Sequence, residues 1–426
     1  MIRNSINNIV KLIVHKHFIL TCFILSIILR IFWLLWLNPE IVSDADWYFE
    51  KAKMIAEGKG YFSFGHPTAF YPVGYSAFLS FFFKIFESSI LIGRVLNIFL
   101  YIGILFFVYK ITKIFFSDKL TINLSFLFLA FYPNHIAYTT LLYNETLFLF
   151  LFSISIFLFL LSLKNQKIIS FFITGILFGL SCYVKPQALF IPLIFFIVSY
   201  VKNSKKNIPL FLLVLYFGLF LSVLPWQLRN YKAFGKVTFI STVKGYDLLI
   251  GNNPYAKGNY GINENYWRKI SLEENECIYD KKTKKLALKY IRNHPLESIK
   301  IIPKKLYYFF WPGMEGFGWN MNGLSENQMK ILHKLRYYSM GAFLLFLIIF
   351  SISVVYQLFW NYKQISFATL AIYLLLLYHI ILSTVFFGES RFHFHLVPFM
   401  LMLVSDLISK ILTKLKLYNQ SKLHRH

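Results

Sequence analysis

Acidic residues and cysteine are scarce in this chain of 426 residues, and charged residues of either sign make up only 15% of it. An ordinary globular chain is about 25% charged, so the composition excludes a water-soluble protein of several domains. Cys22, Cys182 and Cys277 are too few and too dispersed for a disulfide framework or a cysteine-based metal site. The chain also lacks a His-Glu-x-x-His pair, a Walker-type loop and a Gly-x-Ser-x-Gly elbow, which disfavours zinc hydrolysis, ATP hydrolysis and that class of serine chemistry.

What the chain has instead is apolar surface and positive charge. Hydrophobic residues make up 57% of it, and 44 Lys and Arg against 19 Asp and Glu give a net charge of +25. The basic residues stand in short clusters between apolar runs, as they do in the loops of a membrane protein. A nucleic-acid binder gathers them on one face or arm. We therefore expect a membrane protein with no nucleic-acid partner.

Apolar runs of membrane-spanning length recur along the chain. The first, 18–37, can cross the ~30 Å hydrocarbon core and has Trp33 and Trp36 as interfacial aromatics near its end. It is too long for the core of a cleaved signal peptide and is expected to be a retained anchor. Further candidates lie at about 72–86, 89–109, 121–137, 142–161, 168–184, 187–200, 208–225, 338–359, 366–386 and 394–413. This pattern predicts an all-α polytopic membrane protein.

The distribution of positive charge predicts the topology. The segments expected in the cytoplasm carry 16 Lys and Arg, whereas the short outward turns carry only Lys185 and Arg391. The cytoplasmic segments are the N-terminus, the loops 110–120, 162–167, 201–207 and 360–365, and the tail after Thr413. With both termini in the cytoplasm the number of spans is even, so we predict ten spans and place 72–86 along the outer interface.

This topology divides the chain into three parts. Residues 1–225 form an N-terminal transmembrane module that includes the outward loop 38–71 and the interfacial helix 72–86. Residues 226–337 form a large outward region with a net charge of +10, which favours binding of an anionic ligand or of lipid headgroups. The alternative interpretation of this region is a solvated lid. Residues 338–426 form the C-terminal transmembrane helices and the cytoplasmic tail. Within the outward region we expect an irregular loop with Gly245, Gly251, Gly258 and Gly261, a polar helix at 271–292 and an aromatic helix at 296–311.

Three acidic residues stand at outward helix ends. Asp44 and Asp46 open a predicted helix behind Ser43, a possible N-cap, and Glu145 opens a long apolar helix. Acids at these positions can simply stabilise a helix N-terminus. A charged group at the membrane boundary is also a candidate functional group, here a general base facing a hydroxyl acceptor.

Three basic residues also stand at outward helix ends: Lys185, Arg229 and Arg391. Each could be a snorkelling anchor. Because positive anchors are expected mainly on the cytoplasmic side, the three together predict a site for the phosphate of a lipid-linked donor. Lys84 and Arg94 are expected to anchor headgroups. His393 and His395 are about 200° apart around a helix, so they are not expected to chelate together.

Several short motifs follow one another between the predicted spans. They are Asp44-Ala45-Asp46-Trp47-Tyr48 with Ala52, Gly58-Lys59-Gly60-Tyr61, Pro67-Thr68, Tyr71-Pro72-Val73-Gly74-Tyr75, Arg94, Asn144-Glu145, Tyr183-Val184-Lys185-Pro186-Gln187, Pro225-Trp226, Arg229-Asn230-Tyr231, Phe234-Gly235-Lys236, Gly251-Asn252 and Glu389-Ser390-Arg391-Phe392. In this order they resemble the polyprenyl-phosphate-sugar-dependent glycosyltransferases of the GT-C superfamily, in particular family 39, which includes protein O-mannosyltransferases and the lipid A aminoarabinose transferase. The resemblance covers most of the chain.

The resemblance implies a GT-C-type bundle of about ten transmembrane helices, with the catalytic aspartate in the first outward loop. The matching position is Asp44. This sequence has Ala45 next and its second acid at Asp46, so both aspartates are candidates and Asp44 is favoured. Glu145 is similar to the family's second outward acid, Lys185 to its phosphate-contacting lysine, and Arg391 to a basic residue of a late loop near the donor.

These residues predict an inverting displacement. Asp44 would take the proton of an acceptor hydroxyl as that oxygen attacks the anomeric carbon, and Lys185, Arg229 and Arg391 would neutralise the departing polyprenyl phosphate. No cofactor is required, although Asp46 and Glu145 could hold a divalent cation. The expected partners are a polyprenyl-phosphate-linked sugar donor, membrane lipids and a glycan, lipid or protein acceptor.

Other functions remain open at this point. A lipid-linked-saccharide transporter would use similar charges, but near the midplane of the membrane. An O-antigen ligase or polymerase would rely on Arg and His in late loops, and a purely structural membrane protein is a further alternative. The Lys-, Ile-, Phe- and Asn-rich composition indicates an AT-rich bacterial genome, and hence an inner membrane protein with its site on the periplasmic or extracellular side.

Overall fold

The computed structural model describes residues 2–203, 208–268, 270, 275–360, 362 and 365–423, and these are mainly helical, with two short strands. Among them, six helices are long and apolar enough to cross a membrane. They are α2 (Phe18–Trp36), α5 (Ile90–Phe115), α8 (Asn144–Asn165), α11 (Ile208–Phe234), α18 (Glu326–Trp360) and α19 (Phe367–Val385). The chain is therefore an all-α polytopic membrane protein, as predicted.

The remaining predicted spans are also helical. α6 (Lys119–Ala130) is followed by α7 (Pro133–Ala137) and η1 (Tyr138–Thr140), and together these helices are long and apolar enough to cross a membrane, with a bend of 44° between them. α9 (Ile168–Val184) is a shorter apolar helix, as is the segment Pro186–Lys202 formed by η2 (Pro186–Phe190) and α10 (Ile191–Asn203). α20 (Val397–Leu423) completes the set. By contrast α4 (Gly74–Ile85) has 12 residues, about 18 Å of helix, which is too short to span and fits the predicted interfacial helix.

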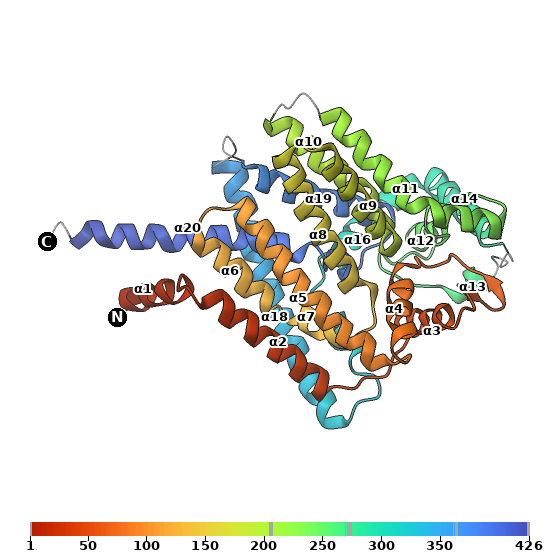
Figure 1. The fold of residues 1–426 in the computed structure, drawn as a ribbon, viewed down its shortest axis with the longest axis horizontal. Coiled ribbons are helices and arrows are strands. Elements are labelled where there is room, and N and C mark those ends of the chain that lie inside the picture. The colour runs from red at the N-terminus through yellow and green to blue at the C-terminus, as the bar shows by residue number, and fades with distance from the viewer. Residues whose placement is uncertain are drawn as a thin grey trace.

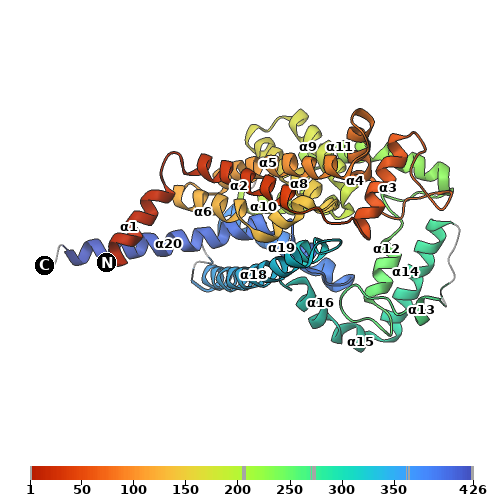
Figure 2. The same ribbon diagram turned by 90° about the horizontal axis from the view of Figure 1, so that it is seen from below.

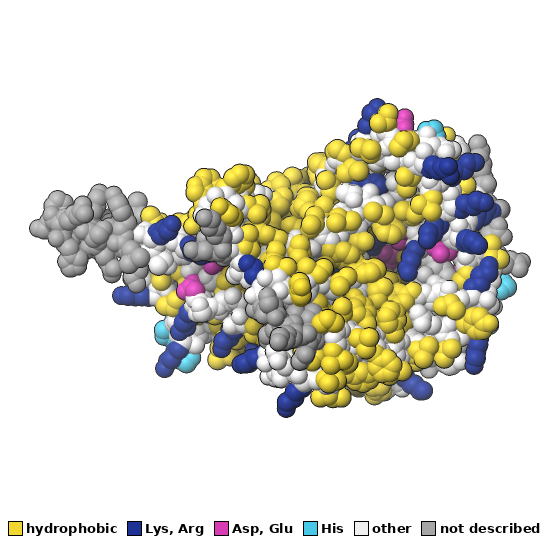
Figure 3. Space-filling model, turned by 90° about the horizontal axis from the view of Figure 1, so that it is seen from above, with side chains coloured by type: hydrophobic (Ala, Val, Ile, Leu, Met, Phe, Trp, Pro, Cys, Tyr) yellow, Lys and Arg dark blue, Asp and Glu magenta, His cyan; other side chains and the backbone are white. Residues whose placement is uncertain are grey.

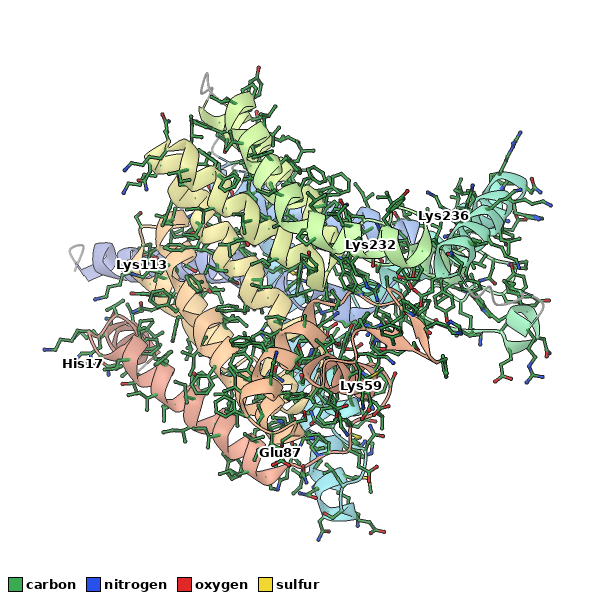
Figure 4. The ribbon with its side chains drawn as sticks, turned by 45° about the vertical axis from the view of Figure 1, so that its right-hand side comes forward. His17, Lys59, Glu87, Lys113, Lys232 and Lys236 are labelled. Atoms are coloured by element: carbon green, nitrogen blue, oxygen red, sulfur yellow. The ribbon has the colours of Figure 1, made fainter. Side chains whose placement is uncertain are left out.

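The molecule has two distinct ends. α1 (Ile2–Ile13) and the tail of α20 lie at the end that carries both termini. The opposite end, which we call the loop end, carries α3 (Asp44–Ala56), α4, α12 (Lys244–Gly251), α13 (Glu264–Arg268) and α14 (Glu276–Asn293) (Figures 1 and 2). His17 and Lys113 lie toward the terminal end, whereas Lys59, Lys232 and Lys236 lie toward the loop end (Figure 4). An even number of membrane crossings requires both termini at the same end, and α1 and the tail of α20 do lie at the same end.

An apolar surface separates these ends. Figure 3 shows hydrophobic side chains covering the middle of the molecule, with Lys and Arg gathered toward both ends. Within the bundle α9 packs on α11 and α5 packs on α8. Glycines allow the first of these contacts, since a Cβ atom at Gly175 would lie 2.0 Å from the Leu215 carbonyl oxygen. Small residues at such helix contacts are typical of membrane proteins.

The loop end differs in detail from the sequence-based expectation. The stretch with Gly245 and Gly251, predicted as irregular, forms α12. The aromatic helix expected at 296–311 is broken into α15 (Pro295–Lys300) and α16 (Ile302–Phe309), with Pro303 in the first turn of the second. The polar helix is α14, and residues 271–274 of its predicted range lie outside the described residues. Two short strands, β1 (Phe62–Ser63) and β2 (His66–Pro67), form a hairpin, and α17 (Glu315–Trp319) precedes α18.

The close contact between α12 and the end of α19 makes Gly251 sensitive to substitution. A Cβ atom there would lie 1.6 Å from the Phe386 carbonyl oxygen, so Gly251→Ala must displace backbone. We expect a loss of about 1–3 kcal/mol of stability, seen as a lower melting temperature of the purified protein in detergent. Gly318→Ala is the matched control, because nothing lies within 4 Å of the position that a Cβ atom would take there. If the two variants had the same melting temperature, the close contact between Gly251 and Phe386 would be contradicted.

Candidate active site

The first predicted acid forms an ion pair across the chain. Asp44 is the first residue of α3, and its carboxylate accepts a 2.7 Å hydrogen bond from Nη1 of Arg391. Arg391 lies in η4 (Ser390–His393), between α19 and α20, and its Nε donates to Glu389 at 2.6 Å. Burial lowers the pKa of the Arg391 guanidinium, but the carboxylates of Glu389 and Asp44 raise it by more, so the guanidinium stays charged.

The turn before Asp44 departs from the expected cap. Ser43 holds the N-cap position of α3, but its side chain accepts no hydrogen bond from the helix. Its φ of 58° lies in the left-handed region that non-glycine residues rarely occupy. Such conformations cost about 1–3 kcal/mol and cluster at functional sites. Ser43 therefore holds the predicted N-cap position without the capping bond, and a strained turn precedes Asp44.

The second predicted acid is also paired. Glu145, in the first turn of α8, accepts a 3.0 Å hydrogen bond from Nζ of Lys185, which connects α9 to η2. The carboxylate is 2% exposed and the ammonium side chain 11%. Within the described part of the chain, Oε2 of Glu145 has no hydrogen-bond partner. One carboxylate oxygen of a buried pair is therefore left unsatisfied by the protein, a costly arrangement that points to a functional site.

Both ion pairs face one cavity. It has a volume of about 400 Å³ and is lined by Asp44, Glu145, Lys185 and Arg391. Its wall toward the membrane helices is formed by Gln187, Leu189, Phe190, Tyr378, His379, Leu382, Ser383 and Phe386. Its other wall is formed by Tyr48, Tyr71, Lys244, Tyr246, Asp247, Tyr260, Phe387 and Phe392. Acidic and basic side chains are visible in a hollow beside the apolar surface in Figure 3.

Two of the predicted site residues lie elsewhere. Asp46 is exposed and does not line this cavity. Arg229 also lies outside it: the guanidinium donates to the carbonyls of Thr68 and Tyr61 at 2.8 Å each and packs 4.7 Å from the Trp226 ring. The structure therefore gives Arg229 a role in holding the hairpin segment against α11.

The cation site suggested by the sequence finds no support in this arrangement. Asp46 and Glu145 do not share the cavity wall, and Glu145 is already paired with Lys185. Among the described residues, no three His, Cys, Asp or Glu side chains are grouped as metal ligands. The residues present do not fit that site.

Arg94 also differs from its predicted role. It is 3% exposed, donates to the carbonyl of Thr140 at 2.9 Å and bonds the carbonyl of Pro39. Rather than a lipid headgroup, it holds the start of the loop that leads to Asp44. Lys84 is exposed. His393 faces the carbonyl of Phe309 and His395 faces His379, so the two histidines have different partners, as expected.

The cavity also contains residues that the sequence reasoning missed. Asp247, Lys244 and Tyr246 come from α12, and His379 comes from α19. No motif marks them, because α12 reads as a glycine-containing loop and His379 lies in an apolar span. A polar group within a span is itself a signal, and it could have identified His379.

Burial raises the pKa of the Asp247 carboxyl from 3.8 to about 7, although the guanidinium of Arg391 opposes this. Glu389, Asp44 and Asp280 raise it further. An acid whose pKa is raised in the folded state binds extra protons when folded, so its contribution to stability falls as the pH rises from about 4 to about 7.

Asp247→Asn should remove this loss of stability at higher pH. We expect the variant to melt a few degrees above wild type at pH 8, and this advantage to shrink at pH 5. Thermal melts in detergent at both pH values measure the difference. Glu264→Gln is the control, since Glu264 is exposed beside Arg268. A difference between Asp247→Asn and wild type that stays constant from pH 5 to pH 8 would contradict the assignment.

Comparisons with known proteins give a family match for part of the chain. Residues 70–226 match the family model described as dolichyl-phosphate-mannose-protein mannosyltransferase. The matched region includes Glu145 and Lys185, whereas Asp44 and Arg391 lie outside it. No protein of curated function matches the chain significantly.

Solved structures similar to the chain include the following two. One is the oligosaccharyltransferase of Archaeoglobus fulgidus, tethered to an acceptor peptide by a disulfide bond, with 15% identity, a TM-score of 0.54 and coverage of 95% of this chain and 51% of that one. The chain thus spans about half the length of that enzyme. The other is ArnT of Cupriavidus metallidurans bound to undecaprenyl phosphate, with 11% identity, a TM-score of 0.44 and coverage of 92% and 77%. The family-model match and the first of these similarities support the resemblance to GT-C glycosyltransferases drawn from the sequence.

Proposed function

We propose that this chain, a polytopic membrane protein with the GT-C fold, is a glycosyltransferase that moves a sugar from a polyprenyl-phosphate donor to a hydroxyl acceptor. The observation that carries the proposal is the cavity of about 400 Å³, which holds the Asp44–Arg391 and Glu145–Lys185 pairs where the membrane helices meet the loop end. The acceptor is a glycan, a lipid or a protein.

The cavity suits an amphiphilic donor. Its wall toward the membrane carries Leu189 and Phe190 of η2 opposite Tyr378 and Leu382 of α19, an apolar lining along which the prenyl chain would leave toward lipid. The donor phosphate would then lie against Lys185. The ammonium of Lys185 would be shared between the phosphate and Glu145, and Lys244 adds a second positive charge to the same cavity.

Asp44 is the proposed general base. It would take the proton of the acceptor hydroxyl while that oxygen forms a bond to the anomeric carbon and the bond from this carbon to the phosphate oxygen breaks. Polyprenyl phosphate leaves with the electron pair, and the anomeric centre inverts in the single displacement. Arg391 orients Asp44 through Nη1. Within the described residues its Nη2 has no protein partner, which leaves it available to the leaving phosphate.

The test is turnover of synthetic undecaprenyl-phosphate sugars by the purified protein. Wild type is expected to consume at least one donor and give an inverted product, and Lys185→Ala is expected to bind donors more weakly. Lys236→Ala is the control, because Lys236 is exposed at the loop end. Wild type that consumes no donor but moves lipid-linked saccharide across vesicle membranes would overturn the proposal in favour of a transporter.

The proposed location is a bacterial inner membrane, with the loop end in the periplasm or outside the cell and both termini in the cytoplasm. A reporter fused after Lys281 should then report exposure outside the cytoplasm. If that reporter were exposed to the cytoplasm, the proposed orientation would be wrong.

A further inference from the structure

The wall of the cavity formed by α12 carries a carboxyl group that the proposed displacement does not use. Asp247 lines the cavity, and nowhere in the described ranges does a protein group hydrogen-bond its carboxyl. The nearby Asp280, in contrast, accepts a 2.6 Å bond from the Gly245 amide. A half-buried carboxyl with no protein partner is free to bond a ligand in the cavity.

The aromatic rings around Asp247 are fixed in place. The Tyr246 ring lies 5.6 Å from the ring of Phe70 and 4.8 Å from that of Trp267. Its hydroxyl lies 3.2 Å from that of Tyr260, whose ring lies 5.8 Å from Phe387. The wall therefore presents ring surface and hydroxyl groups in a preorganised arrangement, which lowers the cost of binding a ligand.

The position of this wall relative to the lipid site limits what can lie against it. Lys185 connects α9 and η2 among the membrane helices, whereas α12 lies at the loop end beyond them (Figure 2). A donor whose prenyl chain lies along η2 and whose phosphate contacts Lys185 must extend its remaining group toward α12. That group is the sugar.

We propose that Asp247, Tyr246 and Tyr260 form the sugar-binding wall of the cavity and select the donor sugar. This inference rests on the proposed function. The Asp247 carboxyl would accept hydrogen bonds from ring hydroxyls, while the aromatic rings contact the apolar face of the sugar. A site built to bond a hydroxyl group strongly rejects an analogue that lacks it, because its own buried polar group is then left unpaired.

The experiment separates binding of the sugar from binding of the lipid phosphate. Dissociation constants are measured in detergent for bare undecaprenyl phosphate and for undecaprenyl-phosphate mannose, glucose and galactose. For the donor that wild type binds best, Asp247→Ala and Asp247→Asn are expected to weaken binding about tenfold or more. Bare undecaprenyl phosphate should bind both variants as it binds wild type. Lys185→Ala should weaken binding of both kinds of lipid, and Glu264→Gln neither.

Each outcome has a distinct meaning. If folded Asp247 variants bind the sugar donors as tightly as wild type does, the sugar-binding wall is wrong and the proposed function stands. If they lose bare undecaprenyl phosphate and sugar donors to the same extent, the role of Asp247 is structural and the inference fails. If wild type binds none of the lipids, the proposed function fails with it.

Discussion

Asp44→Asn is expected to reduce sugar transfer by about 10²- to 10⁴-fold, because an amide cannot accept the proton of the acceptor hydroxyl. The amide oxygen can still accept the 2.7 Å bond from Arg391, so the geometry of the cavity should be kept. Donor binding should therefore change little while turnover collapses. Single-turnover rates and dissociation constants, measured on the same preparation, separate the two effects.

The neighbouring aspartate provides the control. Asp46 is exposed on the same helix, two residues away and outside the cavity. Asp46→Asn should keep wild-type turnover. If Asp46→Asn were the inactive variant, or if both variants were active, the assignment of the base would be wrong.

Arg391→Gln is expected to have the second-largest effect, a loss of about 10²- to 10³-fold in turnover. The guanidinium bonds both Asp44 and Glu389, so its removal leaves two carboxylates close together without their counter-charge. The leaving phosphate would also lose a cation that can neutralise it. A lower melting temperature should accompany the loss of activity, since an unpaired half-buried charge is destabilising.

Arg391→Lys tests whether charge alone is sufficient. A lysine keeps the positive charge but cannot bond two carboxylates with one planar group, so turnover should recover only in part. Lys84→Gln is the control for loss of a positive charge, because Lys84 is exposed. Wild-type turnover by Arg391→Gln would remove Arg391 from the mechanism.

The sequence singled out charged residues whose positions carry a physical cost. Asp44, Glu145, Lys185 and Arg391 are charged residues at the ends of apolar helices, and the structure brings all four to one cavity. Arg229 satisfied the same criterion, yet it bonds the carbonyls of Tyr61 and Thr68. The difference depends on how the hairpin folds back onto α11, which no local pattern in the sequence encodes.

The sequence predicted the membrane helices of the fold better than the loop end. Hydropathy identified the six helices that are long and apolar enough to cross a membrane, because lipid requires long apolar helices. The predicted number of ten spans stays a prediction. At the loop end, where water also satisfies the backbone, the prediction was weaker. α12 was missed because its end glycines mark a close packing contact, with Gly251 against the backbone of Phe386, and packing depends on residues far away in the chain.

The Asp44–Arg391 pair joins residues 347 positions apart. During synthesis the carboxylate emerges with the first helices, whereas its guanidinium partner is made only when most of the chain is complete. A chain that stops before η4 would carry most of the lipid-facing helices without a finished Asp44–Arg391 pair. The proposed activity is therefore expected to begin late in biogenesis, once the segment with Arg391 has been made and has folded back against α3.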